Sequence, residues 1–188
     1  MGRLILLLLL VVACGPTAPS TFSSAEVLPP YDRADWGRWE DADGDCQDTR
    51  QEVLIAESLK PVEFTDERHC RVAKGLWLCP YTWTLIEDPS ELDIDHVVAL
   101  HEAHDLGGYR WSTERKHAYF NDLDNPEHLF AVSASANRSK GDRPPTEWLP
   151  FGEEQRCRYL KARLSVLRRY QLSYDCGEYL PLMEKHCK

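Results

Sequence analysis

The sequence predicts an exported α+β domain with one core, on the strength of three observations. Short segments with strand composition alternate with short amphipathic segments of helical period. The apolar segment after Arg3 is too short to span a bilayer comfortably and is typical of an export signal. Six of the seven cysteines follow that segment, an even number that favours disulfides over metal thiolates in an exported protein.

The N-terminal 35 residues are predicted to lie outside the domain. Residues 1–14 indicate a lipoprotein-type signal peptide, because "VVAC" resembles a bacterial lipobox in which Cys14 becomes the lipidated first residue. The alternative is an ordinary secretory signal. Residues 15–35 are rich in Pro, Ser and Thr and predict a tether, which leaves the domain itself at 36–188.

The six remaining cysteines divide into two odd groups along the chain. If all six are oxidised, at least one bridge must join the N-terminal group to the C-terminal group, because neither group can pair completely within itself. The pairing itself does not follow from the sequence. The groups are Cys46, Cys70 and Cys79, and Cys157, Cys176 and Cys187.

Charge is distributed unevenly. The formal net charge of −9 argues, taken alone, against a polyanionic partner. Residues 110–170 nevertheless hold 12 Lys and Arg against 8 Asp and Glu. This segment predicts either a basic face or an ordinary solvated helix surface, and charge alone does not decide between the two.

The N-terminal half of the domain predicts a helix followed by short strands. Thr49 and Glu52 form a capping-box pattern, and the apolar helix face behind them ends before Pro61. Between residues 62 and 86, "VEF", "GLWL" and "YTWTLI" have strand composition, with Gly75 at an expected hairpin turn.

Two further strands and several helices are predicted after residue 92. The strands are "DIDHVVAL" and "HLFAVSA", at 93–100 and 128–134. Between them, "HEAHDL" predicts a short helix and "STERKHAYFNDL" a helix capped by Ser112. "ASANRSKGD" predicts a turn entering a short helix, and 152–172 a long helix with Leu160 and Leu167 on its inner face.

An acidic loop offers one candidate metal site. Asp41, Asp43, Asp45 and Glu52 fall at positions 1, 3, 5 and 12 of a calcium loop, but Cys46 stands where that loop needs Gly for its sharp turn. Acid-rich helix entries are common, so calcium is a minor alternative.

"HEAHD" offers a second candidate and fails a stricter test. A zinc-protease helix requires His-Glu-x-x-His, whereas Asp105 stands at the fifth position and His104 follows His101 by three residues. A zinc protease is therefore rejected. His101, His104 and His117 are expected to be exposed rather than catalytic.

"DIDHVV" taken together with "ANRSKGD" resembles the HNH endonucleases, also called ββα-metal or His-Me finger nucleases. The likeness extends to small exported bacterial members and to the nuclease half of GmrSD-type restriction proteins, through "DGDC", "RPPTEWLP" and Cys187. It spans 36–188, with the core motif at 91–143. The resemblance implies a ββα-metal finger within one disulfide-stapled domain, between an N-terminal helix-and-hairpin region and C-terminal helices.

The resemblance implies that His96 is the general base and that Asp95 and Asn137 hold a divalent ion. Mg²⁺ is expected before Mn²⁺, Ca²⁺ or Zn²⁺, because hard oxygen donors suit it. Imidazole suits the removal of a proton from water near neutral pH. His128 stands where many relatives carry an Asn that orients the base, so it either takes that role or binds the metal. Adjacent strand residues point to opposite faces, so the strand must end or twist for Asp95 and His96 to face one phosphate.

Further side chains are expected to support this site. Asp93 shares a strand face with Asp95 and is expected to orient a metal ligand. Basic side chains near the motif are expected to contact phosphate, and those of the helix at 152–172 either extend that track or form a plain surface. The phosphate contacts are Arg138, Lys140, Arg143 and, in the insertion between the motifs, Arg115.

The sequence thus predicts an exported, monomeric, metal-dependent endonuclease that hydrolyses DNA, with RNA as an alternative substrate. Little sequence preference is expected, because no recognition helix is visible. The alternative is a catalytically inactive lipoprotein that binds nucleic acid or a partner protein on the same scaffold. A structural calcium protein built on the acidic loop is a third option, and contact with a membrane is expected only through the lipid anchor.

Overall fold

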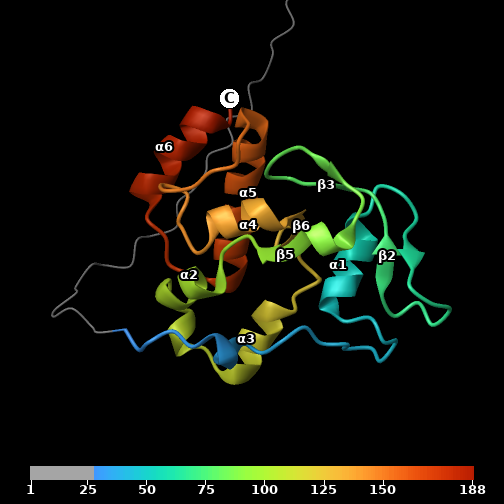
Figure 1. Cartoon of the computed structure of the whole chain (residues 1–188). Coiled ribbons are helices and arrows are strands. Elements are labelled where there is room, and N and C mark those ends of the chain that lie inside the picture. Colours follow the sequence, from blue (N-terminus) through green and yellow to red (C-terminus); the bar gives the residue numbers. More distant parts are fainter. Residues whose placement is uncertain (1–27) are drawn as a thin grey trace, which may run out of the picture.

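The computed structural model describes residues 28–188 (Figure 1). The predicted signal peptide, Cys14 and the first part of the tether lie outside the described residues. The described chain is a mixed α+β structure, as predicted, in which helices surround three two-stranded antiparallel sheets. No helix within residues 28–188 is both long and apolar enough to cross a bilayer.

Packing begins inside the segment predicted as a tether. The Asp32 side chain caps the 3₁₀ helix η1 (Arg33–Trp36) by accepting a hydrogen bond from the backbone N–H of Ala34. Trp36 is fully buried and its ring contacts those of Trp111 and Tyr119. The indole of Trp36 therefore fastens this segment to the rest of the domain.

Helix α1 (Thr49–Glu57) begins one residue away from the predicted cap. Asp48 is the N-cap, and its carboxylate accepts from the backbone N–H of Gln51. The hydroxyl of Thr49 instead donates to the carbonyl of Glu40 and contacts the Asn121 amide oxygen. The capping-box prediction is wrong because Asp48, a stronger N-cap residue than Thr, stands immediately before it.

The first two sheets are small. Strand β1 (Glu63–Phe64) pairs with β2 (Val72–Lys74), and β3 (Trp77–Leu78) pairs with β4 (Leu85–Ile86). Gly75 lies between β2 and β3, which belong to different sheets, so the predicted hairpin turn at Gly75 is wrong. Glycine is required at this position for another reason, because a Cβ there would lie 2.4 Å from the Trp77 ring.

The third sheet and the helix after it form a ββα unit. Strand β5 (Leu92–His96) pairs antiparallel with β6 (Leu129–Ser133), from Leu92 opposite Ser133 to His96 opposite Leu129. Helix α4 (Ala134–Lys140) follows β6 directly, capped by Ser133, and packs against both strands. Strand β5 ends at His96, earlier than predicted.

The long connection between β5 and β6 is helical. It contains α2 (Leu100–Asp105), the 3₁₀ helix η3 (Gly108–Arg110) and α3 (Thr113–Phe120). Ser112 caps α3, as predicted, by accepting from the backbone N–H of Arg115. A further 3₁₀ helix, η2 (Pro89–Glu91), precedes β5.

Two C-terminal helices lie side by side (Figure 1). Helix α5 (Glu153–Tyr170) buries Leu160 and Leu167, as its period predicts, and α6 (Cys176–His186) packs against it. The Cys157–Cys187 disulfide joins the start of α5 to the residue after α6. The C-terminal helices of the predicted architecture are therefore present.

The cysteines do not all behave as expected. Cys46 pairs with Cys70, which joins the acidic loop before α1 to the loop between β1 and β2. This bridge and Cys157–Cys187 each join cysteines of the same half of the domain. Cys79 is a free thiol with no exposed surface, so the six cysteines are not all oxidised and the condition that required a bridge between the two groups is not met. Its sulfur instead accepts from the Ser133 backbone N–H, which ties β3 to β6.

Candidate functional site

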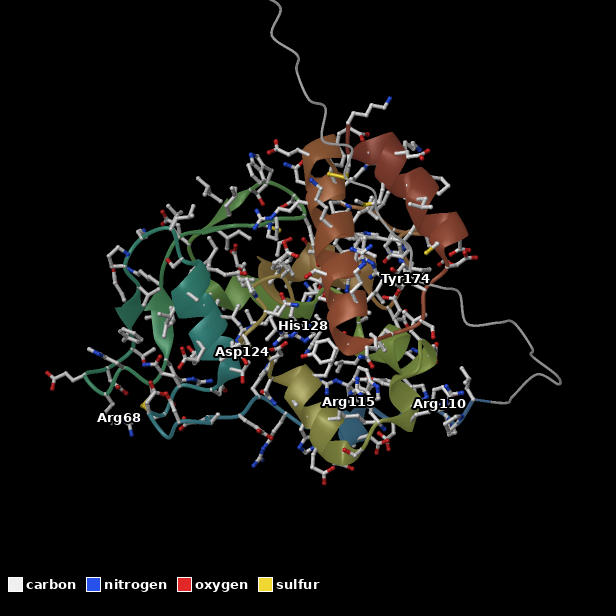
Figure 2. All side chains as sticks on the ribbon, turned by 180° about the vertical axis from the view of Figure 1, so that it is seen from behind. Arg68, Arg110, Arg115, Asp124, His128 and Tyr174 are labelled. Atoms are coloured by element: carbon white, nitrogen blue, oxygen red, sulfur yellow. A yellow bond between two sulfur atoms is a disulfide. The ribbon has the colours of Figure 1, made fainter. Side chains whose placement is uncertain are left out.

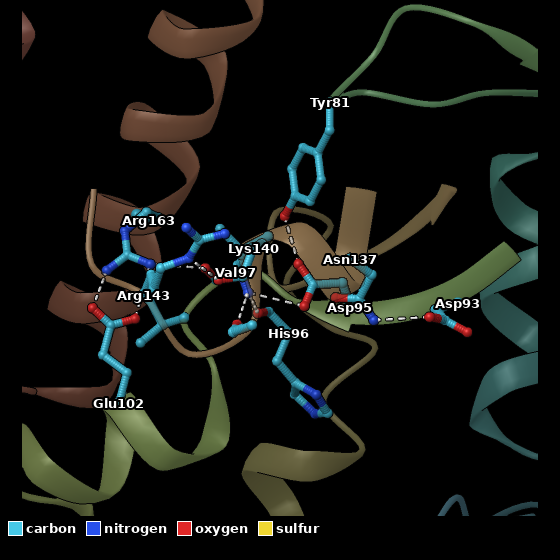
Figure 3. A network of polar contacts seen from close by, with 12 residues as sticks. Tyr81, Asp93, Asp95, His96, Val97, Glu102, Asn137, Lys140, Arg143 and Arg163 are labelled. Atoms are coloured by element: carbon cyan, nitrogen blue, oxygen red, sulfur yellow. Dashed lines mark hydrogen bonds and ion pairs between the residues drawn. The ribbon is translucent and has the colours of Figure 1, made fainter. Parts of the chain in front are cut away.

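The candidate site is built on strand β5, whose residues alternate between two faces (Figure 3). Asp95 and His96 stay in regular register with Phe130 and Leu129, so the strand neither bulges nor twists out of the sheet there. The Asp95 carboxylate and the His96 imidazole consequently point to opposite sides of β5. The two side chains predicted to share one phosphate are thus separated by the strand.

On the side of α4, Asp95 is held by two hydrogen-bond donors. The Lys140 ammonium lies 3.0 Å from Asp95 Oδ1, and the Tyr81 hydroxyl donates to Oδ2 at 2.6 Å. The Lys140 side chain is completely buried and that of Asp95 is 7% exposed. Burial and the neighbouring Asp95 charge raise the pKa of Tyr81 well above 10, which keeps the phenol a donor.

Asn137, also on α4, meets the same side of β5. Its amide Nδ2 donates to Asp93 Oδ2 at 3.1 Å. Because the amide nitrogen is committed to Asp93, the amide oxygen is the atom that Asn137 can offer to a ligand. Helix α4 thus brings one residue to each of the two aspartates, Asn137 to Asp93 and Lys140 to Asp95.

Two buried cations also fix the backbone where β5 ends. Lys140 Nζ donates to the carbonyl of His96 at 3.0 Å, and Arg163 Nη1 donates to the carbonyl of Val97 at 3.0 Å. Arg163 comes from α5, is completely buried and is paired with Glu102 of α2. Consecutive carbonyls of the chain are therefore pinned from different helices, which gives the motif a single geometry.

On the opposite side of β5, His96 lies among aromatic rings. Its Nε2 is 3.0 Å from the carbonyl oxygen of Phe120, which only accepts, so Nε2 carries the proton and Nδ1 the lone pair. The Trp39 indole stacks on the imidazole at 5.5 Å between centroids. Burial, and next the neighbouring His128, lower the pKa of His96 well below 6.5, so the ring is neutral at pH 7.

His128 is bonded in the same way as His96, but to the carbonyl of the residue before Phe120. Its Nε2 donates to the carbonyl of Tyr119 at 2.6 Å, and its ring lies 5.4 Å from that of His96 in an edge-to-face contact. The ring is completely buried, and burial lowers its pKa to about 4. The imidazole therefore contacts α3 and the aromatic rings, and it lies on the His96 side rather than among the oxygen donors.

Lys140 is the clearest departure from the expected roles. The sequence predicts that Lys140 contacts phosphate. Its side chain has no exposed surface and cannot reach a substrate, and its ammonium forms an ion pair with Asp95. Arg138 is exposed on α4, and Arg143 is exposed just beyond it with its Nε bonded to the Lys140 carbonyl. Arg115 of α3, which is labelled in Figure 2, donates to the Tyr170 carbonyl and lies over the Trp111 ring.

The basic residues of α5 do not form one phosphate track. Arg163 is buried with Glu102, Arg156 bonds Glu153, and Arg169 bonds Asp122. Arg158 lies over the Phe130 ring. A continuous basic surface along α5 is therefore not formed, because several of its cations have acidic partners.

The histidines outside the motif differ from one another. His104 is buried and its Nε2 lies 2.8 Å from the Pro29 carbonyl, so its predicted exposure is wrong. His101 keeps 45% of its side chain exposed and pairs with Asp142 at 2.7 Å. Both lie on α2 and both contact the Tyr31 ring, but only His104 also bonds the Pro29 carbonyl.

The acidic loop brings its three aspartates together. Asp41, Asp43 and Asp45 have carboxylate oxygens within 4.8 Å of one another, and all three residues are exposed. Their charges, after the effect of burial, raise the pKa of Glu52 above its ordinary value. Their oxygens also accept backbone N–H groups of the same loop, as in an ordinary acidic turn.

Sequence reasoning did not find Tyr81, Glu102 or Arg163, which hold the motif in place. Tyr81 comes from the loop between β3 and β4 and Arg163 from α5, both outside the core motif in sequence, whereas Glu102 lies on α2 within it. The only signal was the occurrence of charged residues on otherwise apolar helix faces, which does not identify a partner.

The chain is similar in sequence to a known secreted protein. An "Uncharacterized secreted protein" of Arthroderma benhamiae is 34% identical over 170 residues, which cover 86% of this chain and 79% of that protein. The chain belongs to the family of this secreted protein. No family model matches the chain, and no solved structure matches it.

Membership of this secreted family and the two described disulfides agree with the export predicted from the sequence. The protein is exported. Disulfides persist in oxidising compartments, and both bridges have the separation that folded disulfides require, with Cα–Cα distances of 5.0 and 4.9 Å.

Proposed function

We propose that this protein is an exported, metal-dependent nuclease that hydrolyses phosphodiester bonds of DNA, and of RNA as a second substrate. One observation carries the proposal. Helix α4 packs on β5 and β6 so that Asn137 and Lys140 reach Asp93 and Asp95. The two sequence motifs that resemble the HNH pattern, distant along the chain, therefore meet in a ββα unit.

The oxygen donors of this unit fit a hard divalent ion. Asp95 keeps unused lone pairs beside its two hydrogen bonds, and the Asn137 amide oxygen is oriented by the Asp93 bond. Asp95 and Asn137 would hold the ion, with Mg²⁺ favoured and Mn²⁺ as its usual substitute. Such an ion supplies stabilisation of charge on the phosphate and on the departing oxygen.

His96 is proposed as the base that removes the proton from water. Its Nδ1 carries the lone pair and makes no hydrogen bond to any described residue, and the residue keeps 7% of its surface exposed. The ring is neutral at pH 7, which is the form that accepts a proton. Because it lies across β5 from Asp95, it would act from the end of the strand, where the chain leaves the sheet at Val97.

Phosphate binding is proposed at the exposed basic residues next to the motif. Arg138 and Arg143 are exposed at the end of α4, beside the buried Lys140. Contacts to phosphate carry no sequence information, so this arrangement suits cleavage with little sequence preference. It predicts an activity that weakens as the salt concentration rises.

The decisive experiment is digestion of plasmid DNA and of RNA, side by side, with Mg²⁺ and with EDTA. His96→Ala, Asp95→Asn and Asn137→Ala should each abolish cutting in protein that remains folded by circular dichroism. His117→Ala, at a partly exposed histidine of α3, is the matched control and should cut as wild type does. Cutting that persists in EDTA and in His96→Ala would refute the proposal.

A catalytically inactive binding protein is the second candidate, and a specific observation favours it. Both carboxylate oxygens of Asp95 have protein partners, and Trp39 covers one face of the His96 ring. A binding protein of this kind would retain DNA in a binding assay and would leave the DNA uncut with every divalent ion. The double substitution Arg138→Ala/Arg143→Ala should abolish the binding.

The finer proposal on location is the lipid anchor at Cys14. An anchored protein would partition into detergent and gain the mass of a lipid, whereas a freely secreted protein would appear in the medium at the mass of the bare chain. Cys14→Ser, which removes only the acceptor sulfur, is the matched variant.

A further inference from the structure

Lys140 is a cation bound by oxygen atoms inside the candidate metal site. Its Nζ lies 3.0 Å from Asp95 Oδ1, 3.0 Å from the His96 carbonyl and 3.5 Å from the Gly141 carbonyl. An ammonium has three protons, and each has an oxygen partner here. The Lys140 side chain is 0% exposed and that of Asp95 is 7% exposed, so the ion pair is largely shielded from water.

Helix α4 places this ammonium next to the amide oxygen proposed for the ion. Asn137 and Lys140 are three residues apart, so they lie on one face of the helix. Both reach the same side of β5, Asn137 at Asp93 and Lys140 at Asp95. An ion held by Asn137 and Asp95 would therefore share the Asp95 carboxylate with the ammonium (Figure 3).

The charges of this arrangement oppose tight binding of a second cation. A buried ion pair has a neutral net charge, and repulsion between an ammonium and a divalent ion is weakly screened where water is excluded. Asp95 is the acidic group that forms an ion pair with Lys140, and the Asp142 carboxylate lies close enough to interact electrostatically with the same ammonium. Divalent-ion affinity at this site is thus a balance between attraction to two aspartates and repulsion by one lysine.

We propose that Lys140 is a positioning residue that sets the divalent-ion affinity of the site, because its ammonium is the built-in counter-ion of Asp95. This inference rests on the proposed function only in assuming that Asp95 and Asn137 bind an ion. It assigns Lys140 neither to phosphate nor to proton transfer. Neutralising Lys140 releases the full charge of Asp95 to the ion, and removing Asp95 alone leaves an unpaired ammonium in the site.

The test is direct binding of Mn²⁺ to the full chain, measured by electron paramagnetic resonance as loss of the free-ion signal. The acidic loop would also bind Mn²⁺, so all proteins carry Asp43→Asn and Asp45→Asn, which remove two of its three carboxylates. Into this background are placed Lys140→Met, Asp95→Asn, the double substitution of both, and Asn137→Ala. Lys161→Met, at an exposed lysine of α5, is the matched control.

Lys140→Met is expected to bind Mn²⁺ at least tenfold more tightly than the parent, and Asp95→Asn at least tenfold more weakly. The double variant removes one charge of each sign and should return to within about threefold of the parent. Lys161→Met should not differ from the parent. A role limited to stability would lower the melting temperature without this pattern of opposite and cancelling shifts in affinity.

The outcomes separate the inference from the proposed function. If Asn137→Ala weakens Mn²⁺ binding while Lys140→Met does not alter it, the inference fails and the metal site stands. If no binding depends on Asn137, both fail. Should Lys140→Met not fold, the comparison of Asp95→Asn with the double variant decides: equal affinities overturn the inference, and recovery in the double variant supports it.

Discussion

The two sides of strand β5 bury polar groups by different means. On the side of α4, Asp95 forms an ion pair with the Lys140 ammonium, and the Tyr81 hydroxyl donates to its other oxygen. On the other side, His96 and His128 are kept neutral by burial, each with one nitrogen bonded to a carbonyl at the end of α3. One side tolerates charge by pairing it, and the other excludes charge.

Because charge is paired on one side of β5 and excluded on the other, the two sides must respond differently to the loss of a partner and to acid. A buried ion pair is costly to break from one end, because the remaining charge has neither water nor partner. A buried neutral imidazole is instead costly to protonate, so its effect depends on pH. Substitutions on the two sides can therefore be told apart by the pH at which they act.

The largest effect is expected when the pairing side loses its cation. Lys140→Met leaves the Asp95 charge buried without its ion partner and should lower the free energy of unfolding by about 3–5 kcal/mol in urea titrations at pH 7. The double substitution with Asp95→Asn should be more stable than Lys140→Met. Lys161→Met, at an exposed site, should change stability by less than about 0.5 kcal/mol. Equal loss in the single and double variants would mean that packing, not charge, is what Lys140 contributes.

The next effect belongs to the neutral side and appears only in acid. The folded pKa of His128 is about 4, below the unfolded value, so the unfolded chain binds the proton more readily. Its stabilising contribution is full above pH 6.5 and is lost as the pH falls toward 4, a loss of about 3 kcal/mol. His128→Phe should remove this slope, which is measured as the difference between the two unfolding curves from pH 7 to pH 4. His96 should leave an acid-dependent slope of its own in His128→Phe, because its pKa is also lowered by burial. Unfolding curves of wild type and His128→Phe that stay parallel from pH 7 to pH 4 would contradict the prediction, and His117→Phe is the control at a partly exposed site.

Much of the fold follows from local sequence signals, whereas the site's neighbours do not. The periodicity of 152–172 predicts α5, and the composition of 93–100 and 128–134 predicts the strands that become β5 and β6. These are properties of adjacent residues. Arg163 and Tyr81 reach the motif only because α5 and the β3–β4 region fold against it, and no local pattern encodes that contact.

The case of Lys140 shows why residue type alone misassigned a role. A lysine next to a candidate metal site is ordinarily a phosphate contact, because lysine is seldom buried. Here α4 follows β6 without a connecting turn, so the end of the helix faces β5 and its last residue enters the core. The orientation of a seven-residue helix depends on how the preceding strand ends, which the sequence did not specify.

Glu57, a partly buried carboxyl of α1, extends the comparison, because it forms no ion pair within the described residues. Glu57 accepts the Ala131 backbone N–H at 2.8 Å, and burial raises its pKa to about 7. The folded state therefore binds the proton more readily, and the stability present below pH 4.5 is lost as the pH rises through 7. Glu57→Gln, whose amide oxygen can keep the bond to Ala131, should gain about 2 kcal/mol relative to wild type between pH 5 and pH 8. Glu63→Gln, at an exposed glutamate of β1, should show no such gain. If the difference in free energy of unfolding between Glu57→Gln and wild type does not change with pH, the raised pKa of Glu57 is contradicted.

The smallest effect tests how completely the pairing side satisfies Asp95. Tyr81→Phe removes the hydroxyl from Oδ2 but leaves the Lys140 bond to Oδ1 in place. Because the charge remains paired, the expected loss is only about 1–2 kcal/mol, the range for a charged hydrogen bond deleted inside a protein. The ring contacts of Tyr81 with Trp148 and Tyr159 are kept by Phe, so the measurement isolates the hydroxyl. A matched Tyr109→Phe substitution, at a partly buried tyrosine of η3, gives the background. A loss of stability as large as that of Lys140→Met would mean that Tyr81 and Lys140 stabilise Asp95 as one cooperative unit. The two sides of β5 would then differ in their hydrogen-bond networks and not in a single charge pair.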